Sequence, residues 1–167
     1  KNISTLSRQA DTAICQALER AGAGLIIEQD AVTVSRRELR AFEFDATHAP
    51  DLFPALAALA AAAEGESTII GTNRLMHKES DRAETIRREY EKLGISVDIS
   101  EDNIMKIQGD KILPATVFSH NDHRIVMALS VILSVTGGEL DGAQAVRKSY
   151  PGFFDDFMTL GGKADVL

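Results

Sequence analysis

The chain has 167 residues, 44% of them hydrophobic and 26% charged, with 25 acidic side chains against 18 Lys and Arg and a formal net charge of −7. This balance is typical of a globular domain with a sizeable core. Its acidic sign argues against binding to nucleic acid or to acidic membranes. The longest nearly apolar run, 52–63, is too short to span a bilayer, and the single cysteine, Cys15, excludes an internal disulfide. We therefore expect a cytoplasmic protein with no membrane partner.

The first part of the chain predicts a helix and then short strands. Apolar residues at spacings of three and four predict an amphipathic helix over 7–21. Two apolar runs, 25–27 and 32–34, flank a polar turn and predict a hairpin. A further short strand is expected at 42–45.

The middle of the chain predicts two helices with a strand between them. The helix over 50–63 is apolar on almost every side and is therefore expected to be buried. Pro54 is tolerable there because it lies in the first turn. A strand is expected at 67–70 and an amphipathic helix at 81–93.

The last part of the chain predicts a second hairpin and two further helices. The elements expected are strands at 96–99, 104–107 and 117–118, a mostly apolar helix at 122–135 and a weaker helix at 153–160. The whole pattern indicates an α/β fold.

The chain contains an internal repeat. A shift of 72 positions places Gly22 on Gly94 and Gly65 on Gly137. The order of helix, Gly and hairpin thus occurs twice, each time followed by a short strand and a buried helix. One complete βαβαββ unit extends over about 42–107, flanked by partial units. We expect that the chain begins inside a repeat.

Charged residues gather where the predicted helices begin. Asp51 opens one helix, Arg82 lies in the first turn of the next, and Arg124 lies in the first turn of a third. A helix N-terminus favours anions, so an Arg there costs some tenths of a kcal/mol unless an anion bridges the two. Because Arg binds carboxylate and phosphate bidentately, the pattern indicates a ligand that carries phosphate, carboxylate or both.

Taken singly, these residues also have simpler explanations. Asp is a common N-cap, so Asp51 fits that role. Residues 78–82 fit a solvated helix end with i,i+3 ion pairs. His120 and His123 could be two ligands of a metal site, although no third ligand is identifiable. No single residue decides between these interpretations.

Four sequence blocks, in order, resemble the signature of the 5-enolpyruvylshikimate-3-phosphate synthase family. The blocks are 49–56, 74–82, 121–128 and 148–154. Lys-Glu-Ser-Asp-Arg in the second block and Asn-Asp-His-Arg in the third are highly specific in combination. The resemblance implies an inside-out α/β domain of the enolpyruvyl transferase type, built from βαβαββ repeats. It places residues 1–167 in part of the C-terminal domain of a two-domain enzyme whose N-terminal domain is absent here.

The resemblance also implies an activity. The enolpyruvyl group of phosphoenolpyruvate is transferred to the 5-hydroxyl of shikimate 3-phosphate, with release of phosphate, in the shikimate pathway of aromatic amino-acid biosynthesis. No metal or organic cofactor is implied. The alternatives are the related transferase acting on UDP-N-acetylglucosamine and a non-catalytic anion-binding module. Because half of the composite site is missing, we expect the chain alone to be inactive. Its uncovered surfaces predict dimerisation in isolation.

Matching the blocks implies roles for five residues. Asp51 resembles the carboxylate that contacts the attacking hydroxyl and accepts its proton. Glu79 resembles the residue that exchanges a proton with the methylene carbon of phosphoenolpyruvate. Lys148 resembles the lysine that contacts or protonates the leaving phosphate. Lys78 resembles a contact to shikimate 3-phosphate near its reacting hydroxyl, and His123 supports these groups.

The same matching implies an arginine pair and one uncertain contact. Arg82 and Arg124 resemble the pair that holds phosphoenolpyruvate and stabilises developing negative charge. Many relatives have a substrate-binding Asn four residues before the lysine, where this chain has Arg74, preceded by Asn73. Either Asn73 or Arg74 is therefore expected to take that contact.

Overall fold

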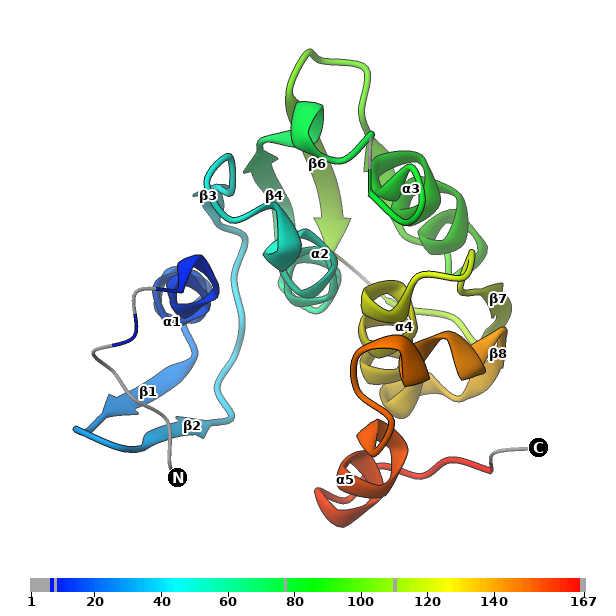
Figure 1. Ribbon diagram of the computed structural model, residues 1–167. Coiled ribbons are helices and arrows are strands. Elements are labelled where there is room, and N and C mark those ends of the chain that lie inside the picture. Colours follow the sequence, from blue (N-terminus) through cyan, green and yellow to red (C-terminus); the bar gives the residue numbers. More distant parts are fainter. Residues whose placement is uncertain (1–6, 8, 77, 110, 166–167) are drawn as a thin grey trace.

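The computed structural model describes residues 7, 9–76, 78–109 and 111–165, and it has the α/β architecture predicted from the sequence (Figure 1). The α-helices are α1 (Ile14–Arg20), α2 (Phe53–Ala61), α3 (Arg82–Lys92), α4 (His123–Thr136) and α5 (Phe153–Thr159). The 3₁₀ helices are η1 (Ala10–Ala13), η2 (Pro50–Leu52), η3 (Thr72–Arg74) and η4 (Ala143–Lys148). The strands are β1 (Gly24–Ile27), β2 (Val32–Ser35), β3 (Glu43–Asp45), β4 (Gly65–Ile70), β5 (Ser96–Asp98), β6 (Ile104–Gly109), β7 (Ala115–Phe118) and β8 (Gly138–Asp141). None of the helices within these described ranges is long and apolar enough to cross a membrane.

The central part of the chain forms one complete repeat unit. Its four strands pair in the order β3-β4-β6-β5. The β3–β4 pair is parallel, whereas β6 is antiparallel to both β4 and β5. Because α2 lies between β3 and β4 and α3 lies between β4 and β5, the chain order is βαβαββ. The predicted repeat architecture is therefore confirmed.

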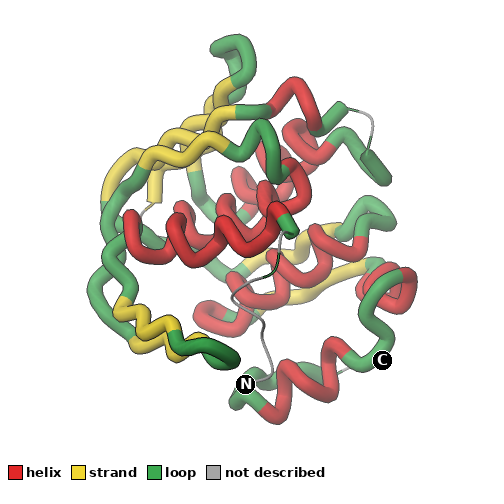
Figure 2. Tube along the Cα trace, turned by 60° about the vertical axis from the view of Figure 1, so that its left-hand side comes forward, coloured by secondary structure: helices red, strands yellow, loops and turns green. Residues whose placement is uncertain are grey.

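Helix α2 is buried because other elements surround it. It packs against β4 and β6 on one side and against α1, α3 and α4 elsewhere (Figure 2). Phe53, Leu56 and Ala60 have no exposed surface. Burial of a side chain the size of Phe53 or Leu56 stabilises the fold by about 1.5–3 kcal/mol. Pro54 lies in the first turn of α2, where it interrupts no helical hydrogen bond.

The repeat is visible in the structure as two similar βαβ segments. In β3-α2-β4 and in β7-α4-β8, a helix connects two strands that pair in parallel. Strand β8 was not predicted, because a short Gly-Glu-Leu-Asp sequence has little intrinsic strand preference. The strand forms because its backbone pairs with the edge of β7, with Val117 opposite Leu140.

The first helix is shorter than predicted. A helix was expected from Ser7, but helical structure begins at Ala10 as a 3₁₀ turn, and α1 itself begins at Ile14. Gln9 is extended, with φ −67° and ψ 135°, so it does not continue a helix. Beyond α1, Gly22 adopts a φ of 88°, which a glycine accommodates without steric cost.

Candidate functional site

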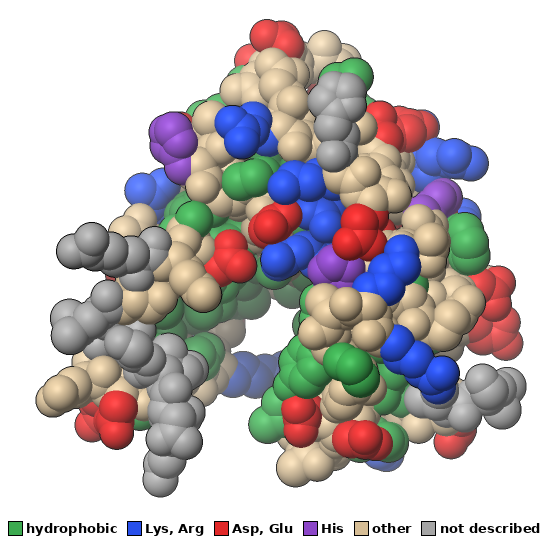
Figure 3. Space-filling view, viewed as in Figure 1, with side chains coloured by type: hydrophobic (Ala, Val, Ile, Leu, Met, Phe, Trp, Pro, Cys, Tyr) green, Lys and Arg blue, Asp and Glu red, His purple; other side chains and the backbone are tan. Residues whose placement is uncertain are grey.

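The beginnings of η2, α3 and α4 meet at one polar pocket. Basic and acidic side chains gather in the middle of the face seen in Figure 3. The pocket has a volume of about 400 Å³ and is lined by Asp51, Lys78, Glu79, Arg82, His123 and Arg124. We call it the Asp51 pocket. The structure thus brings together six of the side chains to which the resemblance gave roles.

Asp51 is surrounded by cations. Its Oδ1 atom lies 2.8 Å from Arg82 Nη1 and 3.2 Å from Lys78 Nζ, and its Oδ2 atom lies 3.4 Å from Arg124 Nη2. Burial would raise the pKa of Asp51, but the hydrogen bonds from Arg82 and Lys78 outweigh it and leave that pKa lowered. The carboxyl group is therefore ionised at neutral pH.

These contacts decide between the simpler explanations. The N-cap of η2 is Ala49, and no side chain caps that helix, so the N-cap interpretation of Asp51 is wrong. Lys78 and Arg82 pair with Asp51 on another helix, so the interpretation of 78–82 as a solvated helix end is also wrong.

Beneath the pocket, Arg82 forms a buried ion pair with Asp122. Their side chains are 2% and 0% exposed, with Arg82 Nε 2.7 Å from Asp122 Oδ2 and Nη2 3.3 Å from Oδ1. Burial would raise the pKa of Asp122 and lower that of Arg82. The hydrogen bonds between them outweigh burial, so the pKa of Asp122 is lowered and that of Arg82 is raised. Asp122 also caps α4 by accepting from the backbone N–H of Arg124 at 2.9 Å.

Sequence reasoning did not assign Asp122 to the site. Its position at the start of a predicted helix was visible, but an Asp there is typical of an ordinary cap. The additional signal was the unfavourable placement of Arg82 in a helix first turn, which required a carboxylate or an anion nearby.

Glu79 joins the pocket to Lys148. Its Oε1 atom lies 3.0 Å from His123 Nδ1, and its Oε2 atom lies 3.4 Å from Lys148 Nζ. Lys148 Nζ also donates to the Asn121 carbonyl at 2.6 Å. Despite its proximity to Glu79, the buried Nδ1 atom of His123 makes no hydrogen bond within the described part of the chain. The pocket thus contains a polar ring atom that remains to be satisfied.

Asn73 and Arg74 lie outside the Asp51 pocket. Asn73 donates its backbone N–H to Asn103 Oδ1 and its side-chain amide to Asp102 Oδ1. Arg74 is exposed and does not line the pocket. Which of the two contacts substrate stays a prediction. His77, in the same block, lies outside the described residues.

The two histidines considered as metal ligands point to different partners. His120 Nε2 lies 2.8 Å from Glu89 Oε1 on α3, whereas His123 faces Glu79 in the pocket. Their arrangement therefore does not form the two-histidine site considered from the sequence.

A different group has the spacing of metal ligands. Ligand atoms of Glu79, Asp122 and His123 lie within 4.8 Å of one another. However, both oxygens of Asp122 already accept from the guanidinium of Arg82. A metal ion there would compete with a buried ion pair, so the chemistry of this group favours the guanidinium.

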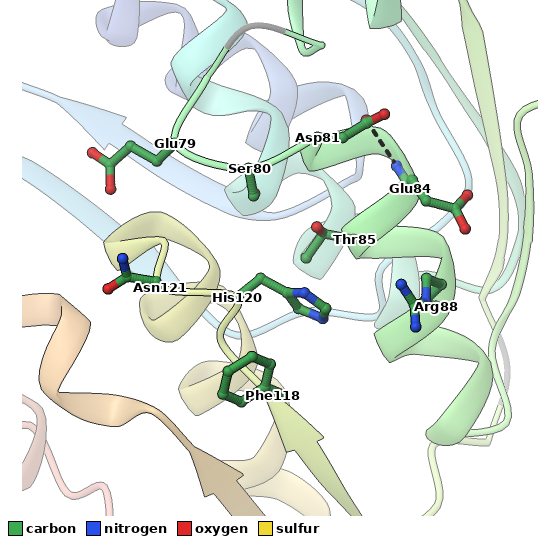
Figure 4. Close-up of a pocket in the computed structure, with 9 residues that line it drawn as sticks. All are labelled: Glu79, Ser80, Asp81, Glu84, Thr85, Arg88, Phe118, His120 and Asn121. Atoms are coloured by element: carbon green, nitrogen blue, oxygen red, sulfur yellow. Dashed lines mark hydrogen bonds between the residues drawn. The ribbon is translucent and has the colours of Figure 1, made fainter.

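The structure has a second pocket, of about 440 Å³, whose lining residues are drawn in Figure 4. It is lined by Glu79, Ser80, Asp81, Glu84, Thr85, Arg88, Phe118, His120 and Asn121. The first turns of α3 form one wall, and the segment between β7 and α4 forms the other. Glu79 lines both pockets, so the two pockets are neighbours.

The fold and the site together define a class of protein. A βαβαββ repeat whose helix N-termini converge on a carboxylate and several cations is an α/β domain suited to small anionic ligands. Solved structures of enolpyruvyl transferases share this fold. EPSP synthase from Acinetobacter baumannii matches with a TM-score of 0.77 and 27% identity, over 89% of this chain and 38% of that one. The enolpyruvyl transferase NikO from Streptomyces tendae matches with a TM-score of 0.68 and 22% identity, over 92% of this chain and 37% of that one, which shows the fold alone.

Sequence comparison identifies the family. The family described as EPSP synthase (3-phosphoshikimate 1-carboxyvinyltransferase) matches residues 1–157, so the chain belongs to it. A protein named 3-phosphoshikimate 1-carboxyvinyltransferase from Methanocella arvoryzae is 38% identical over 164 residues, 96% of this chain and 39% of its own length. One of the same name from Thermococcus kodakarensis is 42% identical over 154 residues, 91% of this chain and 38% of its own length. The chain therefore spans about two fifths of the length of these relatives.

Proposed function

We propose that this chain is part of an enzyme that transfers the enolpyruvyl group of phosphoenolpyruvate to the 5-hydroxyl of shikimate 3-phosphate and releases phosphate. The observation that carries the proposal is Asp51 with Lys78, Arg82 and Arg124 all within 3.4 Å of its carboxylate. A proton acceptor and several anion-binding groups then share one pocket. Because the chain belongs to the EPSP synthase family, we assign enolpyruvyl transfer to this pocket. A cytoplasmic location belongs to the same proposal.

Phosphoenolpyruvate would take over contacts that the protein's own carboxylates now make. Arg124 is 29% exposed and donates to the Asp51 backbone carbonyl at 3.1 Å. The carboxylate or phosphate of the ligand can accept from the same guanidinium in a bidentate geometry. Asp51 would then have fewer cationic contacts and become a better proton acceptor for the attacking hydroxyl.

The remaining roles follow from bond making and breaking. Attack of the 5-hydroxyl oxygen on the substituted carbon of phosphoenolpyruvate passes the hydroxyl proton to Asp51, while Glu79 supplies a proton to the methylene carbon. Departure of phosphate returns a proton from that carbon to Glu79, and Lys148 neutralises or protonates the leaving group. Supporting this, Lys148 Nζ lies 3.4 Å from Glu79 Oε2.

The test uses the full-length protein that contains this chain. Glu79→Gln and Asp51→Asn remove a proton-transfer group with little change of shape, and each should lower kcat by at least about 100-fold. Arg74→Ala changes a residue outside the pocket and should lower kcat less than either acidic variant. Phosphate release measures the rate. Wild-type-like turnover by either acidic variant would contradict the roles assigned here.

We also propose that residues 1–167 form part of the C-terminal domain of a two-domain enzyme and are inactive alone. The share of 38–39% of the relatives' length supports this, because a composite site needs the rest of the protein. The isolated chain should release no phosphate from phosphoenolpyruvate and shikimate 3-phosphate. Robust turnover would contradict this second proposal and leave the first intact.

Free strand edges support dimerisation of the isolated chain. In the complete unit β6 pairs on both sides, but its counterpart β2 pairs only with β1 among the described residues, and β8 only with β7. On the β1–β2 hairpin, the side chains of Ile26 and Val34 are 62% and 54% exposed. Unpaired edges with apolar side chains favour association. Light scattering at high concentration should give a dimer mass, and a monomer would count against this.

The alternatives are separated by their acceptors. If the enzyme used UDP-N-acetylglucosamine, the full-length protein would release phosphate with that acceptor and not with shikimate 3-phosphate. A non-catalytic anion-binding module would bind phosphoenolpyruvate but release phosphate with neither. The names of the relatives and the family match favour the shikimate reaction.

A further inference from the structure

Glu89 is a buried carboxylate to which the proposed chemistry gives no role. It lies on α3 and is 2% exposed. Its Oε2 atom accepts from the backbone N–H of Phe118 at 2.8 Å and from Lys92 Nζ at 2.7 Å, and its Oε1 atom lies 2.8 Å from His120 Nε2. One side chain therefore fastens α3 to the segment between β7 and α4.

The segment that Glu89 holds has an unusual backbone. His120 and Asn121 are consecutive residues with φ of 50° and 59°, a left-handed conformation that residues other than glycine rarely adopt. Figure 4 shows the His120 ring pointing from this segment toward α3. Inside the segment, Asn121 donates its backbone N–H to Ser119 Oγ at 3.2 Å. Such a conformation persists only where surrounding contacts hold it.

The same segment carries groups that build the Asp51 pocket. The Asn121 carbonyl accepts from Lys148 Nζ at 2.6 Å. The next residue, Asp122, receives two hydrogen bonds from Arg82. His123 and Arg124 follow in the first turn of α4 and line the pocket. A shift of this segment would therefore move Lys148 and Arg82 together.

We propose that Glu89 is a positioning residue for this site. It does not line the Asp51 pocket. It acts through the Phe118 N–H and the His120 ring, which set the left-handed turn and hence the places of the Asn121 carbonyl and the Asp122 carboxylate. This inference rests on the proposed function for its kinetic consequence, and on geometry alone for its structural one.

The kinetic test compares Glu89→Ala, Glu89→Gln and Glu91→Ala in the full-length protein. Glu91 is the matched control, because it lies on the same helix, is 50% exposed and pairs only with Arg87 among the described residues. Glu89→Ala should raise KM for phosphoenolpyruvate about 10- to 100-fold, the effect of misplacing binding groups by about 1 Å. Glu89→Gln should recover most of this, since its amide oxygen can still accept from Phe118. Glu91→Ala should match wild type.

The KM separates positioning from loss of folded protein. A variant that only unfolds in part lowers kcat in proportion to the folded fraction and leaves KM unchanged, and circular dichroism measures that fraction. If Glu89→Ala does not fold, His120→Ala replaces it, because His120 is 24% exposed and contributes one of the contacts. A smaller rise in the same KM is then expected. An unchanged KM in the folded variant would overturn the proposal.

A second measurement does not depend on activity. Acetic anhydride modifies Lys148 and Lys163 in one sample, and mass spectrometry gives the ratio of their rates. Lys163 is exposed and serves as the internal reference. In wild type, Lys148 is held by Asn121 and should react more slowly. Glu89→Ala should shift the ratio toward one, whereas Glu91→Ala should leave it at the wild-type value. An unchanged ratio of the Lys148 and Lys163 rates in Glu89→Ala would contradict the positioning role. Absence of turnover in the wild-type protein would contradict only the proposed function.

Discussion

Two arginines on helix α3 make contrasting ion pairs. Arg82, in the first turn, is 2% exposed and bonds to Asp122, which is fully buried. Arg87, five residues on, is 31% exposed and pairs with Glu84 at 2.6 Å and Glu91 at 2.8 Å on the same helix. The shorter distance to Glu84 does not make that pair the stronger contributor, because water screens it.

The contrast explains how Arg82 can lie at a helix N-terminus. A cation there opposes the helix dipole, but Asp122 and Asp51 supply negative charge on both sides of the guanidinium. The protein's own carboxylates thus provide much of the anion that the sequence pattern required. Substitution of each arginine should therefore change the unfolding free energy by very different amounts.

The largest expected effect comes from Arg82→Ala. The change leaves Asp122 as a buried carboxylate without its cation, which costs about 3–5 kcal/mol of unfolding free energy. Urea denaturation measures it. The double variant Arg82→Ala/Asp122→Ala should be more stable than the single one, because no uncompensated charge remains. A loss below about 1 kcal/mol in the single variant would show that the pair behaves as an exposed one.

Acid should weaken the protein through the buried pair. The pKa of Asp122 is lowered in the folded state, so its contribution is fully present above the unfolded value of about 3.9 and is lost as pH falls through the folded pKa. Unfolding free energy measured from pH 6 to pH 2 should therefore decrease. Asp122→Asn should flatten part of this decrease. An identical pH dependence in that variant would contradict the assignment.

Removal of a buried hydroxyl group should have a smaller effect and should raise the unfolding free energy instead of lowering it. Tyr90 is 1% exposed, and its hydroxyl has no hydrogen-bond partner in the described part of the chain. An unsatisfied buried polar group costs about 1–3 kcal/mol. Tyr90→Phe should therefore raise the unfolding free energy, by about 1 kcal/mol after relaxation of neighbours. Thermal melts check the sign, and a lower Tm would indicate a partner for the hydroxyl.

The smallest effect should come from Arg87→Ala. Exposed pairs at i,i+3 and i,i+4 contribute about 0–1 kcal/mol, even when their distances are short. Urea denaturation in low and high salt should give a difference from wild type that shrinks as salt rises. A loss as large as that of Arg82→Ala would remove the contrast between the two arginines.

Local pattern predicted most of the elements, and the repeat could have supplied one more. Helices α2, α3, α4 and α5 and both hairpins follow from periodicity and turn residues. Strand β8 has no such pattern. However, the 72-residue shift places Gly65, the first residue of β4, on Gly137, just before β8 begins. Carrying the repeat one step further would have predicted this strand.

The site was predictable where a residue type is unusual for its position. Arg82 and Arg124 at helix starts are unfavourable without an anion, so their positions predicted an anionic ligand. Asp122 and Glu89 are ordinary residues for a cap and for a charged helix. Their partners lie far along the chain, 40 residues apart for Arg82–Asp122 and 31 for Glu89–His120. Only the packing of α3 against β7 and against the segment that leads into α4 gives these carboxylates their roles.

The repeat also bears on the order in which the protein folds. Strand pairs close over short stretches, for example Phe44 with Ile69 and Val117 with Leu140, so their loop entropy is modest. The contact of Arg124 with the Asp51 carbonyl spans 73 residues and joins the β7-α4-β8 segment to the segment that contains β3 and α2. Each unit can therefore form its sheet before the pocket exists. The docking of the β7-α4-β8 segment onto the complete unit then brings His123 and Arg124 to Asp51 and Arg82.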